Sequence, residues 1–122
     1  MRNATQTYGN VAKQISSPRN LEADLLLQAA SRLQSVHDAW TEKKQLLDEA
    51  LRYNRKLWSI FLSSVTDKEN PLPVEIRQNV ANLGLFVMNQ TLATISDPRP
   101  EQLTSLININ RELAAGLMGR AA

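Results

Sequence analysis

The chain has 122 residues, which is the usual size of one domain, and its 43% hydrophobic content is enough for a packed core and argues against general disorder. It contains no cysteine, which excludes disulfides, thiol catalysis and cysteine-ligated zinc. The net charge is only +2 and no block of basic residues occurs, so the charge gives no indication of nucleic-acid binding.

The first sixteen residues contain no acidic side chain and form the least regular part of the sequence. Tyr8, Val11 and Ile15 have the spacing of a short amphipathic helix, but Gly9 would destabilise it. The segment therefore either packs on the rest of the domain or is an ordinary frayed terminus. It lacks the apolar region of a signal peptide, and no run of eighteen apolar residues follows, so we expect a cytoplasmic protein without a membrane-spanning helix.

A first long helix is predicted to begin at Pro18, with Ser17 as its N-cap. Its apolar stripe continues far beyond the usual length of a helix, but Lys43 and Lys44 fall on apolar positions. We therefore predict a break within residues 38–42, with two helices that fold back on each other.

Glu22 points into the apolar stripe of this first helix, three residues after Arg19. We interpret it as a first-turn acid that is favoured by the helix dipole and pairs with Arg19. A contact with a partner is the alternative.

The next helix, predicted from Leu46 to Val65, has a wide apolar stripe that a single polar residue, Asn54, interrupts near its middle. A lone asparagine in such a seam is typical of an interhelical hydrogen bond that fixes the register. A contact with a partner is again the alternative. Asn110 occupies the same kind of position in the last helix, so the two asparagines are candidates to face each other.

A third long helix is predicted from Pro73 to Ile95, and it carries no charge between Arg77 and Asp97. Apolar residues cover more than half of its circumference. The remainder is a strip of amides around an aromatic ring, made of Gln78, Asn79, Asn82, Phe86, Asn89 and Gln90. Surface helices normally carry charge on their outer face, so this strip is either covered by the chain itself or meets a partner.

The partner-binding hypothesis places Asn82, Phe86, Met88 and Asn89 on a docking surface, with Tyr8 on a displaceable lid. Within the same helix, Gly84 either allows another backbone to approach closely or is simply tolerated.

Ser96 or Asp97 is predicted to cap the last helix, which ends near Met118. Together these elements predict an all-α, single-domain helical bundle of about five helices, mostly antiparallel, that comprises residues 1–122. Residues 1–16 form its N-terminal segment, which is either docked or mobile.

The sequence offers no set of residues suited to catalysis. A single histidine and no cysteine give neither a metal site nor an activated nucleophile, and no glycine-rich phosphate loop or G-x-S-x-G motif occurs. We expect no catalytic residue, cofactor or metal, and a protein that is not an enzyme.

Several short motifs follow one another along nearly the whole chain. They are Tyr8-Gly9; Pro18-Arg19 with Glu22; Ala50-Leu51 with Asn54 and Leu57-Trp58; Asn70-Pro71-Leu72-Pro73 with Arg77; and Leu106-Ile107-Asn108-Ile109-Asn110 with Gly116-Leu117. In this order and spacing they resemble the FlaF family of alphaproteobacterial flagellar biosynthesis proteins.

The resemblance implies a protein that is needed for flagellin production and export and that acts on flagellin as a chaperone-like partner, alongside the post-transcriptional regulator FlbT. Under this hypothesis the uncharged strip shields the amphipathic terminal helices of flagellin before secretion.

Two alternatives remain open. In the first alternative the protein regulates flagellin mRNA, alone or with FlbT, and contacts the RNA through Arg52, Arg55 and Lys56. In the other alternative it forms a homodimer through the uncharged strip.

Overall fold

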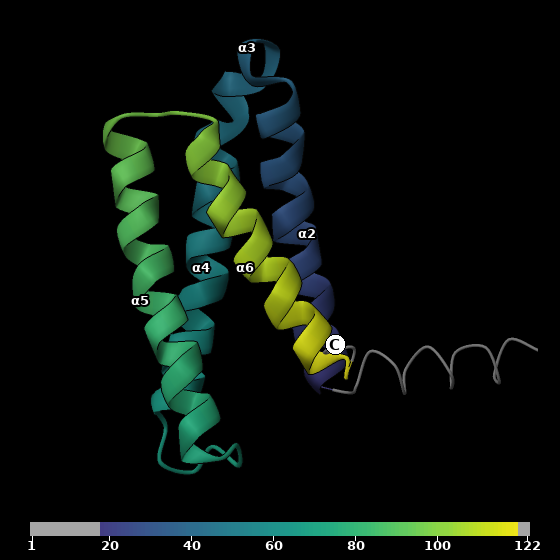
Figure 1. The fold of residues 1–122 in the computed structure, drawn as a ribbon, viewed down its shortest axis with the longest axis vertical. Coiled ribbons are helices and arrows are strands. Elements are labelled where there is room, and N and C mark those ends of the chain that lie inside the picture. The colour runs from purple at the N-terminus through teal and green to yellow at the C-terminus, as the bar shows by residue number, and fades with distance from the viewer. Residues whose placement is uncertain (1–17, 120–122) are drawn as a thin grey trace, which may run out of the picture.

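The structure is a computed structural model that describes residues 18–119. Four long helices make up most of this range: α2 (Pro18–Asp38), α4 (Leu47–Thr66), α5 (Val74–Ser96) and α6 (Glu101–Leu117). Each runs roughly antiparallel to the one before it (Figure 1). The predicted all-α bundle of mostly antiparallel helices is confirmed, while the N-terminal segment of the prediction lies outside the described residues.

The four helices contribute unequally to the bundle. α2 and α6 lie against each other, α4 packs on α2, and α5 packs mainly on α4 at the edge of the molecule (Figure 1). α5 and α6 are closest near the loop that joins them, and from there α6 crosses diagonally away from α5. α5 is therefore the helix with the least support from its neighbours.

The predicted break between the first two long helices is confirmed. α2 ends at Asp38, and Ala39 leaves the helical conformation with φ −127° and ψ 49°. One turn of α-helix, α3 (Trp40–Lys43), and a short 3-10 helix, η1 (Lys44–Leu46), then reverse the chain. Lys43 and Lys44 interrupt the apolar stripe because they lie exposed in this reversal.

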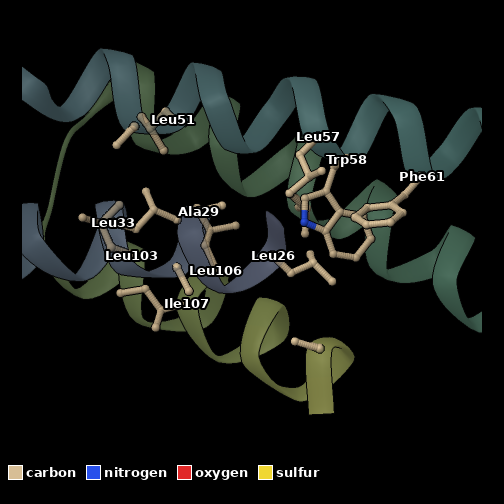
Figure 2. Packing of buried hydrophobic residues seen from close by; sticks show 14 of the residues in the cluster. Leu26, Ala29, Leu33, Leu51, Leu57, Trp58, Phe61, Leu103, Leu106 and Ile107 are labelled. Carbon is tan, nitrogen blue, oxygen red and sulfur yellow. The ribbon is translucent and has the colours of Figure 1, made fainter. Parts of the chain in front are cut away.

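The core is formed chiefly by α2, α4 and α6 (Figure 2). Trp58 of α4 is completely buried, and its ring meets that of Phe61 edge to face at 5.6 Å between centroids. The other large, fully buried apolar side chains are Leu26, Leu33, Leu51, Leu103, Leu106 and Val87. α5 contributes only Val87 to this set, in agreement with its place at the edge.

Side chains close the loop between α4 and α5. The amide of Asn70 donates to the Ser64 carbonyl oxygen at 2.9 Å and accepts the backbone N–H of Leu72 at 2.9 Å. From the first turns of α5, the Arg77 guanidinium donates to the Asp67 carbonyl oxygen at 3.0 Å. In this structure Asn70 and Arg77 hold the loop in place.

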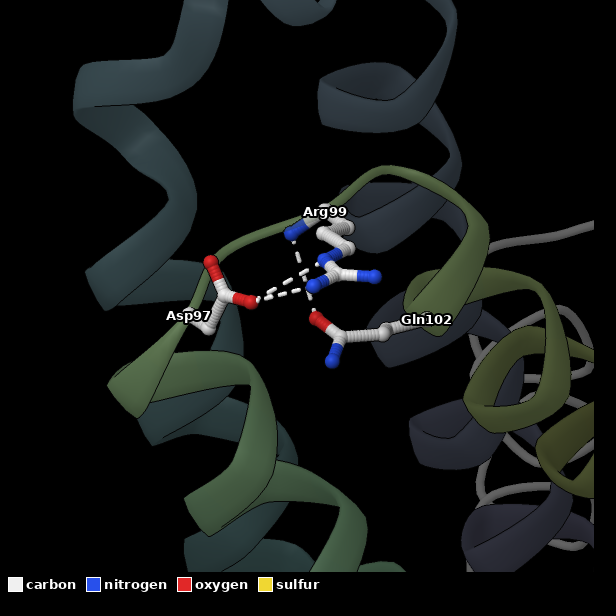
Figure 3. Close-up of polar contacts among 3 residues, drawn as sticks. All are labelled: Asp97, Arg99 and Gln102. Atoms are coloured by element: carbon white, nitrogen blue, oxygen red, sulfur yellow. Dashed lines mark hydrogen bonds and ion pairs between the residues drawn. The ribbon is translucent and has the colours of Figure 1, made fainter.

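The predicted cap of the last helix is wrong. Ser96 is still part of α5, and α6 begins only at Glu101. The Asp97 carboxylate instead accepts two hydrogen bonds from the Arg99 guanidinium, at 2.7 and 3.0 Å (Figure 3). The reason is the Pro-Arg-Pro sequence, because each proline disfavours the helical conformation at the residue before it.

The interpretation of Glu22 as a first-turn acid is wrong, whereas the charge of Arg19 does act on its carboxyl. Because α2 begins at Pro18, Glu22 lies beyond its first turn, and the described residues hold no ion pair between Glu22 and Arg19. The side chain is partly buried, and this burial raises the pKa of its carboxyl. The positive charge of Arg19 acts in the opposite direction and lowers that pKa by a smaller amount.

Candidate protein-docking surface

α5 turns an uncharged and largely apolar face to solvent. We call the exposed residues Gln78, Asn82, Leu85, Phe86, Asn89, Leu92 and Ala93 the α5 outer face. Leu85 is 59% exposed, Phe86 45% and Leu92 56%, which is unusual for three large apolar side chains on one stretch of helix. Since exposed apolar residues that cluster in this way often mark an interaction site, this face is the candidate functional surface.

The face is exposed because the opposite side of α5 carries the smaller residues. Its buried positions are Val80, Gly84, Val87, Thr91 and Thr94. The hydroxyls of Thr91 and Thr94 donate to the carbonyl oxygens of Val87 and Gln90, at 2.7 and 2.8 Å, so they need no partner on another helix. Small side chains let α5 lie close to α4 and leave the larger ones outside.

Gly84 lies directly against the Leu62 side chain of α4. A Cβ atom at this position would lie 2.5 Å from Cδ2 of Leu62, well inside van der Waals contact. Any side chain at this position would require Leu62 to shift, so the glycine leaves room for the Leu62 side chain of α4 rather than for another backbone.

The structure brings together three of the predicted docking residues and places Met88 apart from them. Asn82, Phe86 and Asn89 all lie on the α5 outer face, and the Asn82 side chain accepts a hydrogen bond from Gln78 at 3.1 Å. Met88 lies apart from them, because it is partly buried and packs against the core. Tyr8 lies outside the described residues.

Gln90, which the sequence placed on the same strip, turns toward α6. Its amide donates to the Gln102 carbonyl oxygen at 3.3 Å. Leu85 and Leu92, which the sequence counted among the apolar residues of this helix without assigning them to the core or to the surface, are exposed. The signal that could have placed them is the run of small residues at helical spacing, which marks the side of α5 that can approach another helix.

The two asparagines within the apolar stripes meet as predicted. Asn110 donates to Oδ1 of Asn54 at 2.6 Å and to the Leu26 carbonyl oxygen at 3.3 Å, and it accepts the indole N–H of Trp58 at 2.9 Å. Both asparagines are completely buried. The network joins α2, α4 and α6 in the buried core. It therefore belongs to the packing of the bundle and not to the α5 outer face.

The concave parts of the surface lie elsewhere. A cavity of about 300 Å³ is lined by α2 and by the start of α4, where the Arg32 guanidinium stacks on the Tyr53 ring at 4.1 Å. A second cavity of about 250 Å³ lies between α4 and α5, beside Arg55 and Thr91. The α5 outer face lines neither of them, so its shape suits a helix laid along it better than a small molecule.

The basic residues of α4 form a separate and smaller feature. The Arg52 guanidinium pairs with the Asp48 carboxylate at 2.6 Å, whereas Arg55 and Lys56 are exposed and have no ion pair within the described part of the chain. α4 carries no acidic residue after Glu49.

Within residues 18–119, none of the helices combines the length and the apolar character needed to cross a lipid bilayer. Comparison with curated proteins and with solved structures gave no match. A family model described as flagellar protein FlaF matches residues 4–117, which is nearly the whole chain and includes all the described helices. On this match, the chain belongs to the FlaF family of flagellar proteins.

Proposed function

We propose that this protein binds unassembled flagellin in the cytoplasm, as a chaperone-like export factor that catalyses no reaction. A flagellin helix would lie along the α5 outer face and cover its apolar side chains. The observation that carries the proposal is the exposure of Leu85, Phe86 and Leu92 on a helix with no charge between Arg77 and Asp97.

The dimensions of α5 suit this role. Its 23 residues extend over about 35 Å, which is enough to align with six turns of an amphipathic helix. Burying the exposed part of Leu85, Phe86 and Leu92 would contribute about 1 kcal/mol each. Asn82 and Asn89 would pair with polar groups of the client, and the absence of charge would make binding nearly independent of salt.

Substitution of Phe86 by aspartate tests this assignment. Phe86→Asp places a charge in the middle of the α5 outer face, so we expect affinity for purified flagellin to fall at least tenfold, measured by isothermal titration calorimetry. The fold should persist, since Phe86 is 45% exposed in the native state, and circular dichroism checks this.

Ile60→Asp is the matched control, because Ile60 is 59% exposed but lies on α4, outside the α5 outer face. This variant should bind flagellin as the unsubstituted protein does. Unchanged binding by Phe86→Asp, or an equal loss in both variants, would show that flagellin binds elsewhere.

A second candidate function is regulation of flagellin mRNA together with FlbT. It is favoured by Arg55 and Lys56, the exposed basic residues that lack an acidic partner on the described part of α4. Phosphate contacts weaken steeply as salt is raised, whereas contacts on an apolar face do not. A salt titration of mRNA binding, compared with flagellin binding, therefore distinguishes the two functions.

A further inference from the structure

The centre of the α5 outer face has an internal symmetry that suits a second copy of the same protein. In both directions from the point between Leu85 and Phe86, an apolar residue is followed by an amide: Leu85 and Asn82 toward the start of the helix, Phe86 and Asn89 toward its end. This point lies within one residue of the middle of α5, and the side chains on both sides of it are exposed. A two-fold symmetric interface requires a patch that is complementary to itself, and the centre of this face has that property.

We propose that, without a client, two copies of this protein pair through the α5 outer face, with their α5 helices antiparallel about a two-fold axis between Leu85 and Phe86. In this arrangement Leu85 lies opposite Phe86 of the second copy, and Asn82 lies opposite Asn89 of the second copy. At these central positions apolar groups meet apolar groups and amides meet amides, whereas farther from the axis Gln78 lies opposite Ala93 and Leu92 opposite Asn79.

The distribution of charge supports the same arrangement. No charge occurs between Arg77 and Asp97, so two copies with a net charge of +2 each can approach along this face without local repulsion. Exposed Glu75, at the start of one α5, would lie opposite Ser96 at the end of the second copy's α5, far from its own equivalent. In a parallel pair Glu75 would instead lie beside its own equivalent, and the helix dipoles would oppose association.

The size of the contact sets its strength. One pair of helices about 35 Å long buries less than the roughly 1,600 Å² of a standard stable interface, so the dimer should dissociate at micromolar concentrations. Such a dimer would hide its apolar side chains when the protein is free and would release them to a competitor. The identity of that competitor as flagellin depends on the proposed function, whereas the dimer itself does not.

Sedimentation equilibrium of the purified protein tests the association. We expect the average mass to rise from 13.7 kDa toward twice that value as the concentration is raised from about 5 to about 500 μM. Phe86→Asp should remain monomeric over the whole range, and Ile60→Asp should associate as the unsubstituted protein does. A monomer at every concentration, or equal association of all three proteins, would overturn the proposal.

Cysteine crosslinking tests the geometry, because the chain has no cysteine of its own. Asn82→Cys and Asn89→Cys are both exposed substitutions, and an antiparallel pair brings position 82 of one copy beside position 89 of the other. A mixture of the two variants should therefore form a disulfide at least five times faster than either variant alone. Faster crosslinking of either variant with itself would overturn the antiparallel arrangement.

The dimer and the flagellin assignment fail separately. Loss of flagellin binding in Phe86→Asp, with no self-association of the unsubstituted protein, would overturn the dimer alone. Self-association without any binding of flagellin would support the dimer and overturn the proposed function alone.

Discussion

Asn110 makes more hydrogen bonds across helices than any other side chain described in this structure. It satisfies the indole N–H of Trp58, the Leu26 carbonyl oxygen and Oδ1 of Asn54, and so connects three helices at one buried point. Asn54 contributes less, because its own Nδ2 is buried and has no partner among the described residues. Two residues of the same type, in the same network, thus have unequal importance.

This inequality predicts different costs for the same substitution. Asn110→Leu would leave the indole N–H of Trp58 and Oδ1 of Asn54 buried without a partner and should lower the free energy of unfolding by about 2–4 kcal/mol. Asn54→Leu would remove one hydrogen bond and also an unpaired donor, so its cost should stay below about 1.5 kcal/mol. Urea unfolding followed by circular dichroism measures both.

The double variant provides a check on the mechanism, since its destabilisation should be smaller than the sum of the two single effects. Equal costs for the two single substitutions would contradict the unequal roles. The sequence alone identified both asparagines as candidates to face each other, because each breaks an otherwise apolar stripe. It could not identify which one carries the network, because that depends on the side-chain geometry around Trp58.

Among the helices, α5 shows most clearly which structural properties could be predicted from the sequence and which could not. Its bounds were predicted to within one residue, because prolines flank it on both sides. The side of α5 that faces the core was harder to predict than its bounds. Both sides of α5 carry apolar residues, so the period of the helix does not say which side faces the core, and the sequence could not place Leu85 or Leu92. The start of α6 was misplaced for a different reason, the two closely spaced prolines that precede it.

The contact between α5 and α4 predicts opposite effects for two glycine substitutions. Gly84→Ala gains about 1 kcal/mol of helix propensity but displaces Leu62, so we expect a net destabilisation of about 1–2 kcal/mol. Gly116→Ala meets no atom within 4 Å in α6 and should be neutral or stabilising by up to about 1 kcal/mol. Thermal unfolding of both variants compares them directly.

The cause of the Gly84 effect can be isolated. Leu62→Ala makes room beside position 84, so adding Gly84→Ala to that variant should cost less than it does in the original background. If Gly84→Ala instead stabilises the protein as Gly116→Ala does, α5 does not lie as close to α4 as the structure shows.

At the scale of the whole molecule, the bundle is a central packing of α2, α4 and α6 with α5 attached to one side. Two features favour early opening of α5, its few large buried side chains and its dependence on α4 for support. The sequence predicted an all-α bundle of about five mostly antiparallel helices, since the helices and their directions follow from stripes, prolines and loops. It did not predict which helix lies at the edge, because that depends on the pairing of α2 with α6, which are distant in the sequence.

Hydrogen–deuterium exchange provides a test of this unequal stability. Amides of α5 should exchange at least ten times faster than those in the middle of α2 and α6, when measured at low protein concentration by mass spectrometry. Comparable protection of all four helices would show that α5 opens only with the rest of the bundle.

The two tryptophans of the chain lie in contrasting surroundings, and this makes them natural optical probes. Trp58 is sealed in the core against Phe61, whereas Trp40 is partly exposed at the chain reversal with the Lys44 ammonium 5.7 Å from its ring centre. Iodide should therefore quench the fluorescence of Trp40 and spare that of Trp58. Since neither ring belongs to α5, docking along that helix should leave the emission spectrum unchanged, and any blue or red shift would report a rearrangement in the interior.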